Sequence, residues 1–191
     1  MAGRQAPPVA ELGVEARVQR AFAGLTKKVM KKAQPLSPSV LVDIQLGARS
    51  HPDPQTRRWC LFLLDHYAND QSIEVFAQAL TDEVSYVRDL ALHSIACEPC
   101  KQGDVPIADV VPPVIAVLTD DPDAALRIKA IPVLLGLVDR DPRAREAIRT
   151  AAKQDPDPLV RKCARDALDG HFQMPKKRFE RSQRRHTVGK H

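Results

Sequence analysis

The chain has 191 residues, 43% hydrophobic and 28% charged, so it is long enough to bury a core. Aromatic residues make up only 4% and there are only eight glycines, which disfavours many-stranded sandwiches and barrels. No window approaches about eighteen consecutive apolar residues, and the first residues lack the apolar stretch of a signal peptide. We therefore expect an all-α cytoplasmic protein whose four cysteines are thiols unless a metal binds them.

The charge is strongly segregated along the chain. Residues 1–34 carry seven Lys/Arg and two acidic residues, residues 35–170 carry fifteen and twenty-one, and residues 171–191 carry seven and one. An acidic body with two basic ends implies that any binding of anions belongs to the ends.

Apolar residues recur at helical spacing and predict a leading helix followed by four pairs of helices. The expected ranges are 9–32 for the leading helix, then 38–49 with 54–67, 71–80 with 84–97, 107–118 with 123–138, and 142–153 with 157–169. Asp-Pro pairs mark several expected helix starts, because aspartate suits the N-cap and proline the first helical position. These pairs begin at Asp53, Asp121, Asp141, Asp155 and Asp157.

An internal repeat runs through the helix pairs. The second helix of each pair carries an arginine near its start, followed three positions later by a small residue and seven positions later by a large aliphatic one. These arginines are Arg57, Arg88, Arg127 and Arg161, with intervals of 31, 39 and 34 residues. An aspartate stands six positions before three of them, as Asp82, Asp121 and Asp155, whereas the first unit has His51. Such hairpins cannot bury their apolar stripes alone, so they stack into a solenoid.

The repeated pattern D-x5-R-x2-A-x3-L resembles the HEAT-repeat family, including bacterial HEAT-like repeats of the phycobilin-lyase type, over about residues 38–170. The resemblance implies a HEAT-like α-α solenoid of about four hairpins whose second helices line a concave face. It also implies that the repeated aspartates and arginines form a structural ladder between successive turns. We divide the chain into a basic segment with the leading helix (1–36), the repeat domain (37–170) and a disordered basic tail (171–191).

The long interval between Arg88 and Arg127 contains a candidate metal site. His93 and Cys97 share one helix face, Cys100 follows the helix end, and His66 occupies the corresponding position one repeat earlier. Histidine and cysteine of this spacing suit zinc, and the alternative is ordinary thiols at a helix end.

No motif of a common enzyme class is present, so we expect no catalytic residue and no cofactor other than this possible zinc. A DNA-glycosylase function is disfavoured because the chain has a single tryptophan and an acidic body. We expect that tryptophan, Trp59, to pack the first unit against the leading helix.

The tail lacks apolar periodicity and carries a basic cluster, formed by Lys176, Lys177, Arg178, Arg181, Arg184 and Arg185. Such a tail either solubilises the protein and folds back on its acidic body or binds phosphates of DNA or RNA. The sequence therefore favours a non-catalytic scaffold that binds proteins through its groove, with a nucleic-acid-associated protein as the alternative. We expect neither a membrane nor a small-molecule substrate as partner.

Overall fold

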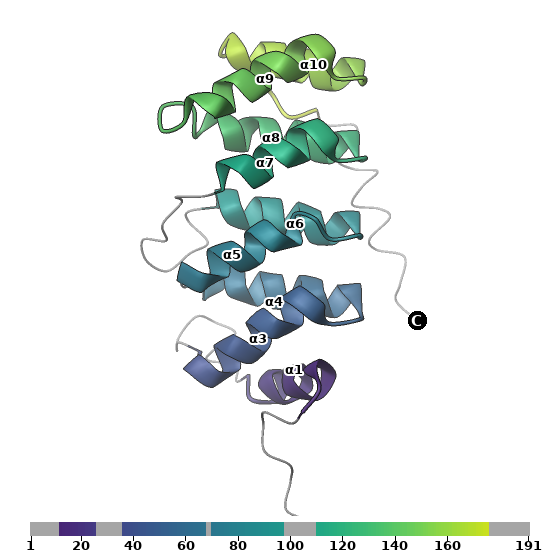
Figure 1. Cartoon of the computed structure of the whole chain (residues 1–191), viewed down its shortest axis with the longest axis vertical. Helices are drawn as coiled ribbons and strands as arrows, with labels where there is room; N and C mark the ends of the chain where they lie inside the picture. The colour runs from purple at the N-terminus through teal and green to yellow at the C-terminus, as the bar shows by residue number, and fades with distance from the viewer. Residues whose placement is uncertain (1–11, 26–35, 68–69, 98–109, 176–191) are drawn as a thin grey trace, which may run out of the picture.

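The computed structural model describes residues 12–25, 36–67, 70–97 and 110–175, and within these ranges it contains α-helices and no strand (Figure 1). A leading helix, α1 (Val14–Ala23), precedes four helical hairpins. They are α3 (Pro38–Ser50) with α4 (Pro54–His66), α5 (Asp70–Ala79) with α6 (Ser85–Ala96), α7 (Val111–Asp120) with α8 (Ala124–Leu135), and α9 (Pro142–Gln154) with α10 (Pro158–Leu168). The predicted all-α solenoid of four hairpins is thus confirmed.

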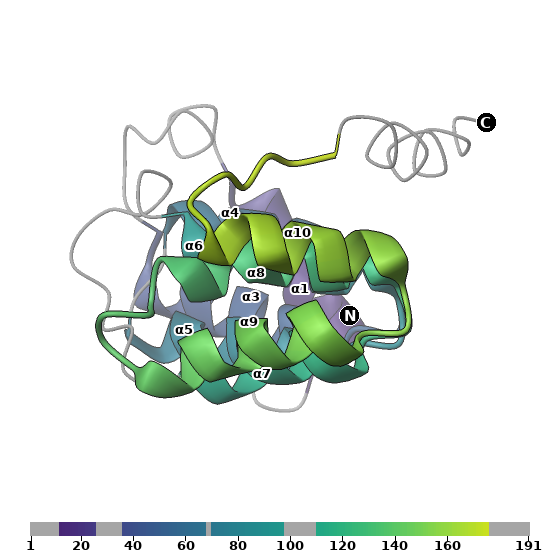
Figure 2. The ribbon, with the colours of Figure 1, turned by 90° about the horizontal axis from the view of Figure 1, so that it is seen from above.

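The hairpins stack along the long axis of the molecule and form two layers. Figure 2 shows the first helices, α3, α5, α7 and α9, in one layer and the second helices, α4, α6, α8 and α10, in the other. We call the second layer the B helices. Each B helix packs on the next along the stack, α4 on α6, α6 on α8 and α8 on α10, as expected for a solenoid in which each unit touches its neighbours.

The core lies between the two layers and is filled at the repeated positions. The small residues three positions after the repeated arginines are fully buried, and they are Cys60, Ala91, Ala130 and Ala164. The largest apolar side chains of the core come from every unit, among them Leu64, Phe76, Leu92, Leu134 and Ile148. Small residues there let neighbouring helices approach closely, while the large ones fill the space between layers.

Two cysteines belong to this core. Cys60 and Cys163 are free and buried, as expected for residues at or beside the small position. Burial raises the pKa of the Cys60 thiol to about 12 and so keeps it protonated at neutral pH.

The leading helix is shorter than the predicted range of 9–32, because it ends at Ala23 and the N–H of Gly24 caps it by donating to the carbonyls of Arg20 and Ala21. Helix α1 packs on α3. Gly47 of α3 makes this close approach possible, because a Cβ there would lie 2.5 Å from Val18 Cγ2 and 2.8 Å from Cys60 Sγ.

The Asp-Pro pairs mark only some of the helix starts. Asp53, Asp141 and Asp157 are N-caps whose carboxylates accept hydrogen bonds from backbone N–H groups. Asp121 and Asp155 instead follow the ends of α7 and α9, so the prediction that they are N-caps is wrong. In each Asp-Pro-Asp sequence the second aspartate caps the helix, since the carboxylate of the first binds the arginine of the preceding unit.

Candidate functional site

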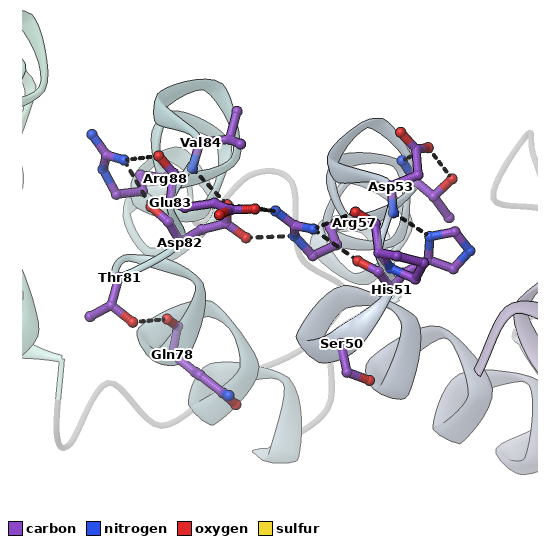
Figure 3. A network of polar contacts seen from close by, with 12 residues as sticks. Ser50, His51, Asp53, Arg57, Gln78, Thr81, Asp82, Glu83, Val84 and Arg88 are labelled. Atoms are coloured by element: carbon purple, nitrogen blue, oxygen red, sulfur yellow. Dashed lines mark hydrogen bonds and ion pairs between the residues drawn. The ribbon is translucent and has the colours of Figure 1, made fainter. Parts of the chain in front are cut away.

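The edge of the solenoid where each hairpin turns carries a network of arginine and aspartate side chains (Figure 3). Arg57 donates from Nε to Asp82 Oδ2 (2.7 Å) and from Nη2 to Asp82 Oδ1 (2.9 Å). Its Nη1 donates to the carbonyl of His51 (2.8 Å) within its own unit. The two paired side chains are 8% and 9% exposed. Hydrogen bonding to Asp82 raises the pKa of the Arg57 guanidinium, which therefore stays charged.

The same pairing recurs in the next two units. Arg88 binds Asp121 through two hydrogen bonds of 2.7 and 3.0 Å, and Arg127 binds Asp155 through two of 2.8 and 3.0 Å. The carbonyls of Asp82 and Asp121 in turn accept from the arginine of their own unit, each at 2.8 Å. These contacts form the ladder between successive turns that the resemblance implies.

Each ladder aspartate also holds its own turn. The Oδ1 atoms of Asp82, Asp121 and Asp155 accept from the backbone N–H two residues further on, at 2.8 to 2.9 Å. In the first unit the Nδ1 atom of His51 accepts the corresponding hydrogen bond from Asp53 (3.1 Å). His51 thus keeps the turn without a carboxylate, a role that the sequence did not reveal.

The last ladder arginine differs from the others. Arg161 donates from Nη1 to the carbonyl of Asp155 (2.6 Å) and to that of Pro156 (3.2 Å). Within the described ranges it makes no bond to a carboxylate. At the other end, Arg17 and Arg20 of α1 bind the buried carboxylate of Asp43. The ladder and its ends account for these charged groups structurally.

The outer surface of the B helices has a different character. The residues two and five positions after the ladder arginines are all at least partly exposed in the first three units. They are Trp59 and Phe62 of α4, Leu90 and His93 of α6, and Lys129 and Pro132 of α8, and we call this surface the B-helix face. It places aromatic, apolar and charged groups side by side across three units.

A cavity of about 420 Å³ opens on this face. Its walls come from α4, α6 and α8 and from the segment after α10, and they include Arg58, Leu90, Ala96, Val133 and Met174. A second cavity of about 250 Å³ shares Ala96 and Val133 and continues toward Arg140. Together they form a hollow between α6 and α8, which we call the α6–α8 groove.

Charged groups of both signs lie along the groove. Asp89 of α6 and Lys129 of α8 form an ion pair across it and also line its wall. His93 Nε2 lies 3.7 Å from Oδ2 of Asp65, whose side chain is buried on α4. The groove therefore combines apolar walls with fixed polar groups, as sites for ligands commonly do.

Aromatic rings continue the face along α4. The rings of Trp59 and Phe62 meet edge to face with centroids 5.7 Å apart, and those of Phe62 and His66 do so at 4.7 Å. Trp59 is 46% exposed, so the expectation that it packs the first unit against the leading helix is wrong. Val18 makes the close contact at Gly47 instead, because the Trp59 side chain points away from the core.

The structure gives the predicted zinc site no support. Cys97 is disulfide-bonded, so the expectation of a thiol is wrong for this residue, and Cys100 lies outside the described ranges. The His93 side chain lies near Asp65 and His66 packs on Phe62. Among the residues that the structure describes, no group of three or more His, Cys, Asp or Glu side chains is placed to hold a metal ion.

The tail is described only at its beginning. Phe172 packs against the core cluster and Met174 lines the larger cavity. The basic residues predicted to bind nucleic acid lie outside the described ranges, and they are Lys176, Lys177, Arg178, Arg181, Arg184 and Arg185. None of the described helices is long and apolar enough to cross a membrane.

The stacked hairpins and their ladder define an α-solenoid repeat protein. Comparison with known families matches residues 111–177 to HEAT repeats, which confirms the resemblance over the last two hairpins, α7 to α10. The same ladder geometry continues into the units before them through Arg57 and Arg88. No curated protein matches the chain.

Proposed function

We propose that this HEAT-repeat protein is a non-catalytic scaffold that binds a protein partner on its B-helix face. The observation that carries the proposal is the exposure of large aromatic side chains on this face, with Trp59 at 46% and Phe62 at 36%. Tryptophan and tyrosine dominate the energetic centres of protein interfaces, and the groove beside them adds Tyr86 to the same surface.

The ladder residues have a structural role, so they are not candidates for binding a partner. Its buried arginines and aspartates are engaged with one another and with backbone groups, so they hold the units together. Binding is then left to the exposed positions of the repeats, as is usual for solenoids, which use an extended surface of stacked units to bind proteins.

A capture experiment with two matched variants tests the proposal. Full-length wild type, the double variant Trp59→Ala/Phe62→Ala and the control Val42→Ala are compared, because Val42 is 49% exposed but lies on α3. We expect a partner that wild type and control retain from a cell lysate and that the double variant loses, followed by at least a tenfold rise in Kd with the purified partner.

The double variant should keep the wild-type circular dichroism spectrum, so that loss of the partner reports on the face rather than on folding. An equal set of captured proteins for all three chains, or equal loss in both variants, contradicts the proposal.

A second candidate function is nucleic-acid binding through the tail, which the seven Lys/Arg and one acidic residue of 171–191 favour. Affinity for single-stranded RNA or DNA should then fall steeply between about 50 and 200 mM salt. Replacing the tail lysines and arginines by glutamine should flatten that dependence. Equal and negligible binding of both proteins at low salt overturns this candidate.

A further inference from the structure

The segment 171–175, which follows α10, turns back over the B helices. Figure 2 shows the segment 171–175 running over this layer, and Met174 forms part of the cavity wall together with Leu90 of α6 and Val133 of α8. Phe172 packs against the core cluster two residues earlier. A piece of the protein's own chain thus lies in the surface to which we assign partner binding.

We propose that the α6–α8 groove is a binding site for an extended peptide that places a methionine or similar flexible apolar residue against its wall. The segment 171–175 is its resident intramolecular ligand, and a partner peptide of the same chemistry must displace it. This inference rests on the proposed function and names its ligand class and its regulation.

The backbone of the segment indicates an extended ligand. The segment 171–175 forms no helix, and in an extended chain the side chains of residues i and i+2 point to the same side. Phe172 is partly buried against the core cluster, whereas Gln173 and Met174 are exposed, and Met174 is the residue of this segment that lines the cavity. Met174 suits an irregular cavity because its side chain is unbranched and polarizable.

The resident segment is held loosely enough to be displaced. Met174 remains 38% exposed, and the cavity beside it still measures about 420 Å³, within the usual range of about 300–1,000 Å³ for ligand pockets. At its start the segment is fixed by the hydrogen bond from the His171 N–H to the carbonyl of Asp166 (2.7 Å). A partner peptide that fills more of the cavity gains apolar contact that the tail does not make.

The tail and the repeat domain differ in the sign of their charge. The tail continues from Met174 into a segment rich in lysine and arginine, whereas residues 35–170 carry twenty-one acidic against fifteen basic residues. Opposite net charges raise the rate of encounter between the two.

A competition experiment on the full chain tests the inference. The probe is a fluorescent synthetic peptide with the sequence of residues 170–185, and its Kd is measured by anisotropy for wild type and for Phe172→Ala/Met174→Ala. Because the resident ligand lowers the fraction of open groove, we expect the double variant to bind the probe at least tenfold more tightly than wild type does.

Substitutions in the groove, made in the chain that also carries Phe172→Ala/Met174→Ala, locate the binding site. Val133→Glu and the exposed substitution Ala96→Arg should each weaken probe binding at least tenfold, and a scrambled peptide of equal charge should bind no variant as tightly as the probe. Ala96→Arg keeps the test valid if Val133→Glu impairs folding.

The outcomes separate this inference from the proposed function. If wild type and Phe172→Ala/Met174→Ala bind the probe equally and the groove variants lose it, the tail does not occupy the groove. The groove then remains a binding site. Equal binding of probe and scrambled peptide, or no binding to any chain, overturns the ligand class. Neither result touches the test with Trp59 and Phe62 variants.

Discussion

The edge of the solenoid that carries the ladder and the B-helix face belong to the same hairpins, but they differ in which positions repeat. Along the edge the ladder pairs Arg88 with Asp121 and Arg127 with Asp155 in the same geometry, with little variation in distance. Two residues after the first three ladder arginines, on the face, the side chain changes in every unit, and the same position after Arg161 is the buried Cys163. The first three units have Trp59, Leu90 and Lys129 at this position.

The repeat encodes the fold at the ladder positions and leaves the positions on the face free to vary. A buried bidentate pair fails if either partner changes, so the ladder positions are constrained in each unit. A surface position tolerates most substitutions with little change in stability, so it can be adapted to a partner. Stability should accordingly depend on the edge, and binding on the face.

The largest expected effect is on the ladder. Asp121→Ala should lower the free energy of unfolding by about 3–5 kcal/mol, because it leaves the Arg88 charge buried without its partner. Asp123→Ala, which removes only the N-cap of α8, should cost about 1 kcal/mol. Urea unfolding measures both losses, and equal losses would mean that the ladder aspartate contributes no more stability than an ordinary N-cap.

Arg127 and Arg161 occupy the same position of the repeat but bind different partners. Arg127→Ala removes a bidentate ion pair, whereas Arg161→Ala removes only bonds to carbonyls. We expect about 3–5 kcal/mol for the first substitution and about 1 kcal/mol for the second, by the same urea titration. A loss for Arg161→Ala as large as for Arg127→Ala would mean that the carbonyl contacts, rather than the carboxylates, stabilise the ladder.

On the face, substitution should hardly affect stability. Trp59→Ala is expected to change the free energy of unfolding by no more than about 0.5 kcal/mol, while Leu92→Ala in the core should cost about 2–5 kcal/mol. Thermal unfolding followed by circular dichroism compares the two. If Trp59→Ala proved as costly as Leu92→Ala, the tryptophan would belong to the core and not to a binding surface.

The smallest effect concerns the pH dependence of one cap at the edge. The Thr56 hydroxyl, 2.6 Å from Asp53 Oδ2, is the main cause that holds the pKa of the Asp53 carboxyl below its ordinary value. The stabilisation by this cap is therefore present above the ordinary carboxyl pKa and is lost as the pH falls through the lowered one.

Replacing the hydroxyl tests this cause. Thr56→Val should raise the pKa of Asp53 toward its ordinary value in an NMR titration of the carboxyl carbon. The pKa of Asp141, lowered mainly by Arg143, serves as the control and should stay unchanged. A constant pKa of Asp53 in this variant would assign the shift to the backbone hydrogen bonds instead.

Sequence analysis predicted the elements that depend on repetition and missed those that depend on single contacts. The hairpins followed from periodicity, and the ladder followed from the resemblance to HEAT repeats. The pattern does not show which aspartate of an Asp-Pro-Asp sequence caps the helix, since Asp121 and Asp155 are required by the arginine of the preceding unit. The leading helix was predicted too long because apolar spacing continues past Gly24.

The groove could not be predicted from the sequence, because it too depends on contacts between units. Its walls come from three units and from Met174, and such a hollow depends on how neighbouring units pack and on where the chain returns. Sequence spacing likewise brought His93, Cys97 and His66 together as metal ligands, but it does not fix the directions of their side chains. The His93 ring lies near Asp65 instead.

The double use of each ladder aspartate has a consequence for how the molecule opens. The carboxylate of Asp121 belongs to the arginine of one unit and its carbonyl to the arginine of the next, so disturbing this single turn releases two guanidinium groups at once. Partial unfolding confined to one hairpin would leave charged groups of its neighbours unpaired. Adjacent hairpins should therefore exchange their amide hydrogens together, as one cooperative unit larger than the repeat itself.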